Sequence, residues 1–144
     1  MAQEQQTQQV EMARIDEKTI KLDLSSEVSF DSGQAALKSE FAPSLDKIAS
    51  ILSQYDQTEV YVLGHTDSDG SEDYNLNLSL ERAAAVSQYF ENRGVVGSRL
   101  VVQGLGEANP RADNTTVEGK ALNRRVEVLL KQTGEITEPV EVTE

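Results

Sequence analysis

The spacing of hydrophobic residues changes several times along this chain, and these changes constrain its fold more than any other feature. Residues 20–24 alternate apolar and charged side chains, as in a half-buried strand, and Val28 and Phe30 extend or restart the pattern. Between residues 37 and 55 the apolar side chains recur every three or four positions, as along one face of a helix. Residues 59–63 are apolar on both faces after their first position, which is typical of a strand covered by helices.

A second helix is predicted after Gly64, where the apolar residues return to helical spacing. Its predicted inner face carries Leu76, Leu80, Ala83, Val86 and Phe90. We expect Asp73 or Asn75 to cap its start and Gly94 to end it. Residues 100–103 and 125–130 are then predicted to form two further strands, separated by a polar loop.

The predicted order is strand, helix, strand, helix, strand, strand, and the helical crossovers are long enough to join parallel neighbours. This order predicts an α/β sandwich in which two main helices pack on a mixed four-stranded sheet. The first helix is expected to be capped by Ser39 and to hold Pro43 in its first turn, where proline is tolerated. At 144 residues, the chain is long enough for one domain with its own core.

Both ends of the chain are polar and offer little apolar surface to offset the entropy lost on ordering. We therefore expect a polar linker over residues 1–15, a domain over residues 16–132 and an acidic tail over residues 133–144. Ile136, Val140 and Val142 alternate with polar residues, so packing of part of the tail as an edge strand stays open.

The charge balance argues against several kinds of partner. The chain has 25 acidic and 13 basic residues, and its formal net charge of -12 repels nucleic acids and anionic membrane surfaces. No apolar run approaches the roughly 20 residues that span a bilayer, so we expect no membrane-spanning helix in the given sequence. Because cysteine is absent, the chain has no disulfide, thiolate nucleophile or sulfur ligand for a metal.

Residues 64–75 (GHTDSDGSEDYN) place four acidic side chains where a strand is predicted to end and a helix to begin. Ligand sites often form at such ends. Oxygen-bearing side chains alternate at Asp67, Asp69, Ser71 and Asp73 as in a calcium-binding loop, but the register is wrong. Glu72 would occupy the glycine position of that loop and Leu78 the position of its bidentate glutamate. We therefore expect no metal and no other cofactor, and some of these acids favour the positive N-terminus of the helix.

Arg82 lies on the second predicted helix, about 80° away from its apolar stripe. An arginine at the flank of a stripe usually covers the core with its aliphatic part or makes a weak surface ion pair. The residue pattern alone therefore predicts a surface role for Arg82.

Several motifs in this region occur together and in a fixed order. They are G-H-T-D at residues 64–67, Tyr74 followed by Asn75, and L-S-x-x-R-A at residues 78–83. F-D-S-G at residues 30–33 precedes them, and ADNTTVEGKALNRRVEV follows. Over roughly residues 18–131 the chain thus resembles the OmpA-like C-terminal domain, a peptidoglycan-associated module.

The resemblance implies a domain that holds the peptide stem of peptidoglycan, without cleaving it, through the diamino acid meso-diaminopimelate. Asp67 and Arg82 match the family residues that hold this ligand. The positions implied at the rim of the pocket are Asp31, Gly33 (through its backbone), Asp69, Asn75 and Arg124. The free end of diaminopimelate carries an ammonium and a carboxylate on one carbon, which suits one acceptor beside one forked donor.

Enzyme activity is not expected. The chain has no G-x-S-x-G motif, and His65 is its only histidine, for which we expect a structural role.

The resemblance also implies a periplasmic location, attached to the outer membrane or cell envelope through an upstream anchor, with the Gln-rich start as a linker. Two points stay open: homo-oligomerisation, and an ion-binding or protein-interaction module that has the same fold but does not bind peptidoglycan.

Overall fold

The computed structural model describes residues 10–25, 30, 37–55 and 58–132. The elements in chain order are β1 (Val10–Asp16), β2 (Thr19–Ser25), the 3-10 helix η1 (Ser39–Phe41), α3 (Ala42–Gln54), β3 (Thr58–His65), α4 (Glu72–Asn92), the 3-10 helix η2 (Gly97–Arg99), β4 (Leu100–Gly106), α5 (Val117–Asn123) and β5 (Arg125–Gln132). Within the described ranges, every helix is too short or too polar to cross a bilayer.

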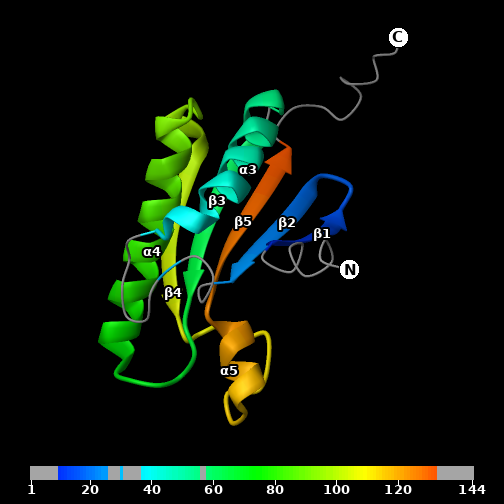
Figure 1. The fold of residues 1–144 in the computed structure, drawn as a ribbon. Helices are drawn as coiled ribbons and strands as arrows, with labels where there is room; N and C mark the ends of the chain where they lie inside the picture. Colours follow the sequence, from blue (N-terminus) through cyan, green and yellow to red (C-terminus); the bar gives the residue numbers. More distant parts are fainter. Residues whose placement is uncertain (1–9, 26–29, 31–36, 56–57, 133–144) are drawn as a thin grey trace.

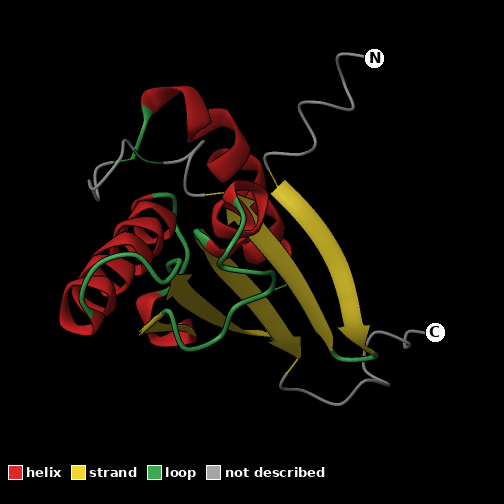
Figure 2. Ribbon diagram, turned by 90° about the horizontal axis from the view of Figure 1, so that it is seen from below, coloured by secondary structure: helices red, strands yellow, loops and turns green. Residues whose placement is uncertain are grey.

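The strands form one mixed sheet in the order β1-β2-β5-β3-β4 (Figure 1). β3 and β4 are parallel, whereas β5 is antiparallel to both β2 and β3. The predicted α/β fold with a mixed sheet is confirmed, although the sheet has five strands instead of four. Because β5 lies between β2 and β3, the crossover through α3 joins two strands that are not neighbours. Figure 2 shows how the strands twist across the molecule.

β1 is the additional strand, and it lies mostly within residues 1–15, which we expected to be a linker. Its turn into β2 is closed by the backbone N–H of Lys18, which donates to Asp16 Oδ1 at 2.8 Å. Met12 lies opposite Leu22 in the ladder, but it is 70% exposed. β1 is therefore held by backbone pairing more than by burial, which explains why no apolar pattern predicted it. The edge strand that the sequence left open for the tail falls outside the described residues.

The core lies between the sheet and the two long helices. Its buried members from the sheet are Leu22, Leu24, Val60, Val62, Val126, Val128 and Leu130, and those from α3 and α4 are Leu45, Ile48, Ala49, Leu52, Ala83, Val86 and Phe90. The strand residues face one another in register, so both helices cover the same face of the sheet. The opposite face of the sheet carries charged groups at one end, including Asp23 and Glu127. The sequence had instead predicted helices on both faces of β3.

The helix starts differ from the predictions. Ser39 begins η1 instead of capping a helix, and α3 starts at Ala42 without a side-chain cap. Pro43 lies in the first turn of α3, as predicted.

Ser71 caps α4 and accepts a hydrogen bond from the backbone N–H of Tyr74 at 3.1 Å, so the predicted caps at Asp73 and Asn75 were wrong. α4 ends at Asn92, and Gly94 follows with φ of 102°, which confirms the predicted stop.

The inner face of α4 begins with polar residues. Asn75, Ser79 and Arg82 are buried, whereas Leu76 and Leu80 are 41% and 45% exposed. The prediction was wrong for these two leucines and for Arg82, which is not on the flank. The helix lies close to the sheet here. A Cβ built on Gly64 would come within 2.0 Å of the Ser79 carbonyl oxygen, so there is no room for a side chain at this position.

Candidate functional site

The candidate site lies where β3 ends and α4 begins. The backbone N–H of Thr66 donates to the Gly106 carbonyl at 2.8 Å, which ties the end of β3 to the end of β4. The chain then turns at Asp67, whose Oδ1 accepts from the backbone N–H of Asp69 at 2.9 Å. This turn is the local hydrogen bond that aspartate side chains favour. It holds the Asp67 carboxylate at the entrance to α4.

Asp67 is buried, and its second oxygen is paired across the molecule. Arg124, which follows α5, donates through Nη1 to Asp67 Oδ2. The two residues are 57 positions apart in the chain, so only the tertiary fold brings them together. An aspartate is rarely buried unless it is paired, and Arg124 provides that partner.

Arg82 is also buried, with 5% of its surface exposed. Its guanidinium lies 5.0 Å from the centroid of the Phe30 ring, within the range of a cation–π contact. Burial lowers the pKa of Arg82 from its ordinary value, and the positive charge of Arg124 acts in the same direction. An anionic partner would therefore be favourable at this position.

Asn75 joins three segments around the site. Its Nδ2 donates to the Asp69 carbonyl at 2.9 Å and to Glu107 Oε1 at 3.0 Å, and it lies 3.4 Å from the Asp67 carbonyl. These contacts connect α4 to the acidic loop and to the loop after β4. Asn75 is therefore a buried residue that connects the segments around the site, whereas the resemblance implied a place on the rim of the pocket.

The remaining predicted site residues have different outcomes. Asp69 is exposed, and its Oδ1 lies 3.2 Å from Lys120 Nζ of α5. Asp31 and Gly33 fall outside the described residues. The structure thus brings Asp67, Asp69, Asn75 and Arg124 into one connected group, and it places Arg82 next to Phe30.

The sequence analysis missed α5, which lies at the end of the sheet beside the start of β5 (Figure 1). Thr116 caps this short helix by accepting from the backbone N–H of Gly119 at 2.9 Å. Asn123 is fully buried, and its Oδ1 accepts from the backbone N–H groups of Arg111 and Ala112 at 2.7 and 2.9 Å. Threonine followed by an acidic residue is a helix-start signal, but seven residues are too few to show a clear periodicity.

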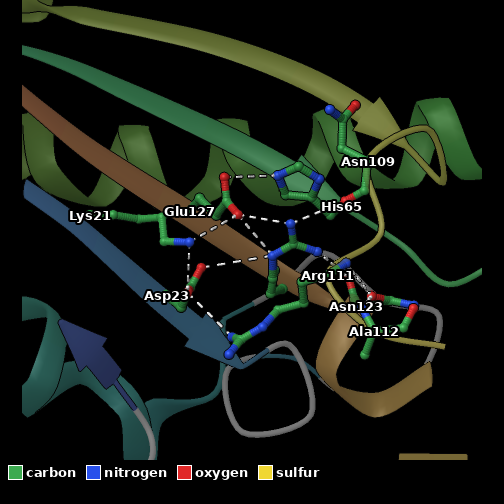
Figure 3. Close-up of polar contacts among 9 residues, drawn as sticks. Lys21, Asp23, His65, Asn109, Arg111, Ala112, Asn123 and Glu127 are labelled. Atoms are coloured by element: carbon green, nitrogen blue, oxygen red, sulfur yellow. Dashed lines mark hydrogen bonds and ion pairs between the residues drawn. The ribbon is translucent and has the colours of Figure 1, made fainter. Parts of the chain in front are cut away.

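A second charged cluster lies on the other face of the sheet, close to the site (Figure 3). Arg125 donates to Glu127 Oε2 through Nε and Nη2 at 2.9 and 2.8 Å. His65 is buried, with Nε2 3.2 Å from Glu127 Oε1, and no site role is evident for it. Burial alone would raise the pKa of Glu127, but His65 and Arg125 lower it to about 2. Burial also raises the pKa of Asp23, despite the cations around it.

This cluster holds the chain around Arg124. Arg125 Nη2 also donates to the Asn109 carbonyl at 3.1 Å, and Arg111 Nη1 donates to Asp23 Oδ2 at 3.3 Å. These bonds tie the loop before α5 to the sheet. They therefore fix the position from which Arg124 reaches Asp67.

The acidic loop has roles other than metal binding. Glu72 and Asp73 lie in the first turn of α4, where negative charge is favourable, and Asp67 and Asp69 are engaged with cationic side chains. In the part of the chain that the structure describes, no three acidic or histidine side chains form a group that could hold a metal. The site instead offers a buried carboxylate and a buried guanidinium at one end of the sheet.

Comparison with known proteins identifies relatives over most of the domain. The model of the OmpA family matches residues 29–124. The chain is 48% identical over 109 residues to the probable lipoprotein YiaD of Escherichia coli, covering 76% of this chain and 50% of YiaD. It is 43% identical to the peptidoglycan-binding protein ArfA of Mycobacterium tuberculosis, covering 60% of this chain and 26% of ArfA. The chain thus spans half or less of these two relatives.

One solved structure with a similar fold is the cell wall anchor of the T6SS from Pseudomonas aeruginosa. The TM-score is 0.80 at 29% identity, and the similarity covers 92% of this chain and 94% of that one. The similarity therefore includes nearly the whole of both chains.

Proposed function

Because this chain belongs to the OmpA family, we propose that it binds peptidoglycan non-covalently, through the meso-diaminopimelate of the peptide stem. The observation that carries the proposal is the burial of Asp67 and Arg82, both in family motifs, at one end of the sheet. Burying two ionisable side chains is costly, so a site that keeps both is suited to a charged ligand. The names of ArfA and of the T6SS anchor support the same ligand class.

The chemistry of the ligand matches these two side chains. The free end of diaminopimelate carries an ammonium and a carboxylate on the same carbon. In the proposed complex, the ammonium lies against the Asp67 carboxylate, which it shares with Arg124. The carboxylate takes two hydrogen bonds from the planar Arg82 guanidinium, in an environment where burial strengthens the contact.

The proposed role in the cell follows from binding without cleavage. The domain would tether an envelope protein, or the outer membrane, to the cell wall from the periplasmic side. The membrane contact would come from an anchor elsewhere in the full-length protein. Asp31, Gly33, Asp69, Asn75 and Arg124 complete the proposed binding site.

An NMR titration tests this proposal. The ligand is a muramyl peptide that contains meso-diaminopimelate, and the comparison is the same peptide with lysine, which lacks the carboxylate for Arg82. We expect selective shifts at Asp67, Arg82 and Asn75 with the first peptide and weaker ones with the second. The Asp67→Ala, Arg82→Ala double variant should lose these shifts.

Arg93→Ala is the matched control, because Arg93 pairs with Asp46, a residue of α3, away from the site. This variant should bind like the wild type. If a folded wild type shows no shifts with either peptide, the proposal is wrong, and an ion-binding or protein-interaction module becomes the better interpretation.

A further inference from the structure

A cavity of about 470 Å³ adjoins the proposed site at Arg124, which is one of its lining residues. It lies between the end of β2, the loop before α5, and α5 itself. The lining residues that matter for its chemistry are Asp23, Arg111, Glu118, Leu122, Arg124 and Arg125. Because Arg124 also pairs with Asp67, one guanidinium borders both the proposed site and this cavity.

The lining is positively charged within an acidic protein. Three arginines and two acidic residues contribute to it, whereas the whole chain has a formal net charge of -12. Arg125 and Asp23 are buried within the charged cluster described above. The side chains of Arg111 and Arg124 are 31% and 29% exposed, so a ligand in the cavity can reach both.

We propose that this cavity is a second subsite, which takes a carboxylate of the stem residue next to diaminopimelate. The inference rests on the proposed function. In the peptide stem, the residue before diaminopimelate is a glutamate linked through its side chain, which leaves its α-carboxylate free. Two arginines from different segments suit such a group, because the guanidinium fork matches a carboxylate. Leu122 provides an apolar wall for the aliphatic part of the stem.

The test uses two peptides that differ in one group. Both contain meso-diaminopimelate preceded by the γ-linked residue, which is glutamate in one peptide and its α-amide in the other. The amide has nearly the same shape but no charge. We expect the wild type to bind the carboxylate peptide about fivefold more tightly by calorimetry, as for a partly exposed ion pair.

Arg111→Ala should lower this preference, since only Arg124 remains to hold the carboxylate, and it should leave the affinity for the amide peptide within about twofold of the wild type. Arg111 also donates to Asp23, so its loss could loosen the loop before α5. A second variant avoids this problem. Glu118→Gln removes a negative charge from an exposed position in the lining, and it should increase the preference for the carboxylate peptide. Arg93→Ala is the control, and it should keep the wild-type preference.

The outcomes separate the two proposals. If neither peptide binds a folded wild type, the proposed function fails and the subsite fails with it. If the wild type binds both peptides equally, the function stands and the subsite is excluded. A loss that is equal for both peptides in Arg111→Ala, with no change in preference in Glu118→Gln, would assign Arg111 a structural role and would also overturn the subsite.

Discussion

Arg82 is the residue whose environment differs most from its prediction. Helical geometry placed it beside an apolar stripe, at the surface. In the structure it is buried against Phe30, and the first turns of α4 approach the sheet with Asn75 and Ser79 inward. The angle of a residue on a helix does not show which other segment covers it. Only the resemblance to a family indicated that Arg82 has a special role.

The first prediction concerns the planar guanidinium of Arg82, which can donate two hydrogen bonds to one carboxylate. Arg82→Lys keeps the positive charge but loses bidentate contact with a carboxylate, and its ammonium is more costly to bury. We expect about a tenfold or greater loss of affinity for a diaminopimelate peptide, with the fold retained. Calorimetry with the variant, next to Arg93→Lys as a control, measures this loss. Near-normal binding by Arg82→Lys would contradict the proposed contact.

The second prediction concerns Glu127 and pH. Its pKa in the folded protein is about 2, below the ordinary value of 4.5, so folding favours the ionised form. This contribution to stability is fully present above pH 4.5 and is lost as the pH falls toward 2. Glu127→Gln should therefore lower the free energy of unfolding at neutral pH, by about 1–3 kcal/mol, and the difference from the wild type should shrink in this acid range.

Denaturant unfolding at a series of pH values measures this difference. Glu81→Gln, on the exposed side of α4, is the control and should follow the wild type. A constant difference between Glu127→Gln and the wild type at all pH values would show that Glu127 stabilises the fold by packing rather than by charge.

At the scale of elements, the contact between α4 and the sheet determines where Asn75 lies. α4 presents a polar inner face at its start, and glycines on β3 and β4 let it come close. A Cβ on Gly104 would come within 2.5 Å of the Leu80 backbone nitrogen, so this position, like Gly64, has no room for a side chain. This close approach places Asn75 where it can join the acidic loop to Glu107. The strand pattern predicted β3 and β4, but it did not predict how closely α4 lies against them.

The third prediction tests this approach. Gly64→Ala would force the new Cβ against the Ser79 carbonyl, which is backbone and cannot move alone. We expect a loss of about 2–3 kcal/mol in the free energy of unfolding, as for other overpacked sites. Gly97→Ala is the control, because its Cβ would meet only the flexible carboxylate of Glu91 and should change stability by less than about 0.5 kcal/mol. Equal effects of the two substitutions would contradict the close-packing interpretation.

α5 and β1 were missed for different reasons. α5 is short, and it is held by Thr116 and by buried polar contacts of Asn123 rather than by an apolar stripe. β1 is held by pairing with β2. In both elements the stabilising partner is polar or lies in another segment, so hydrophobic spacing within the element carries little signal.

At the scale of the whole molecule, charge determines how a ligand approaches. The chain has a net charge of -12, and peptidoglycan also carries carboxylates, so long-range attraction cannot drive the encounter. Affinity has to come from short contacts in a small, partly buried site, which salt screens only weakly.

The fourth prediction follows from this balance. The affinity for a diaminopimelate peptide should change by less than about threefold between about 0.05 and about 0.5 M NaCl, since few counterions are released. Calorimetry at several salt concentrations measures it. A steep fall in affinity with salt would point to a polyelectrolyte contact and away from the Asp67 and Arg82 site.

Hydrophobic spacing was enough to predict the class of fold, the long helices and most strands, and the motifs indicated the residues of the proposed site. These features depend on local spacing and on residue identity, which are present in the chain before it folds. Three features became known only from the folded chain: β5 lies between β2 and β3, Arg124 pairs with Asp67, and Arg82 is buried. These features depend on which distant segments meet. Periodicity reports a segment's own faces, whereas pairing and burial depend on its neighbours.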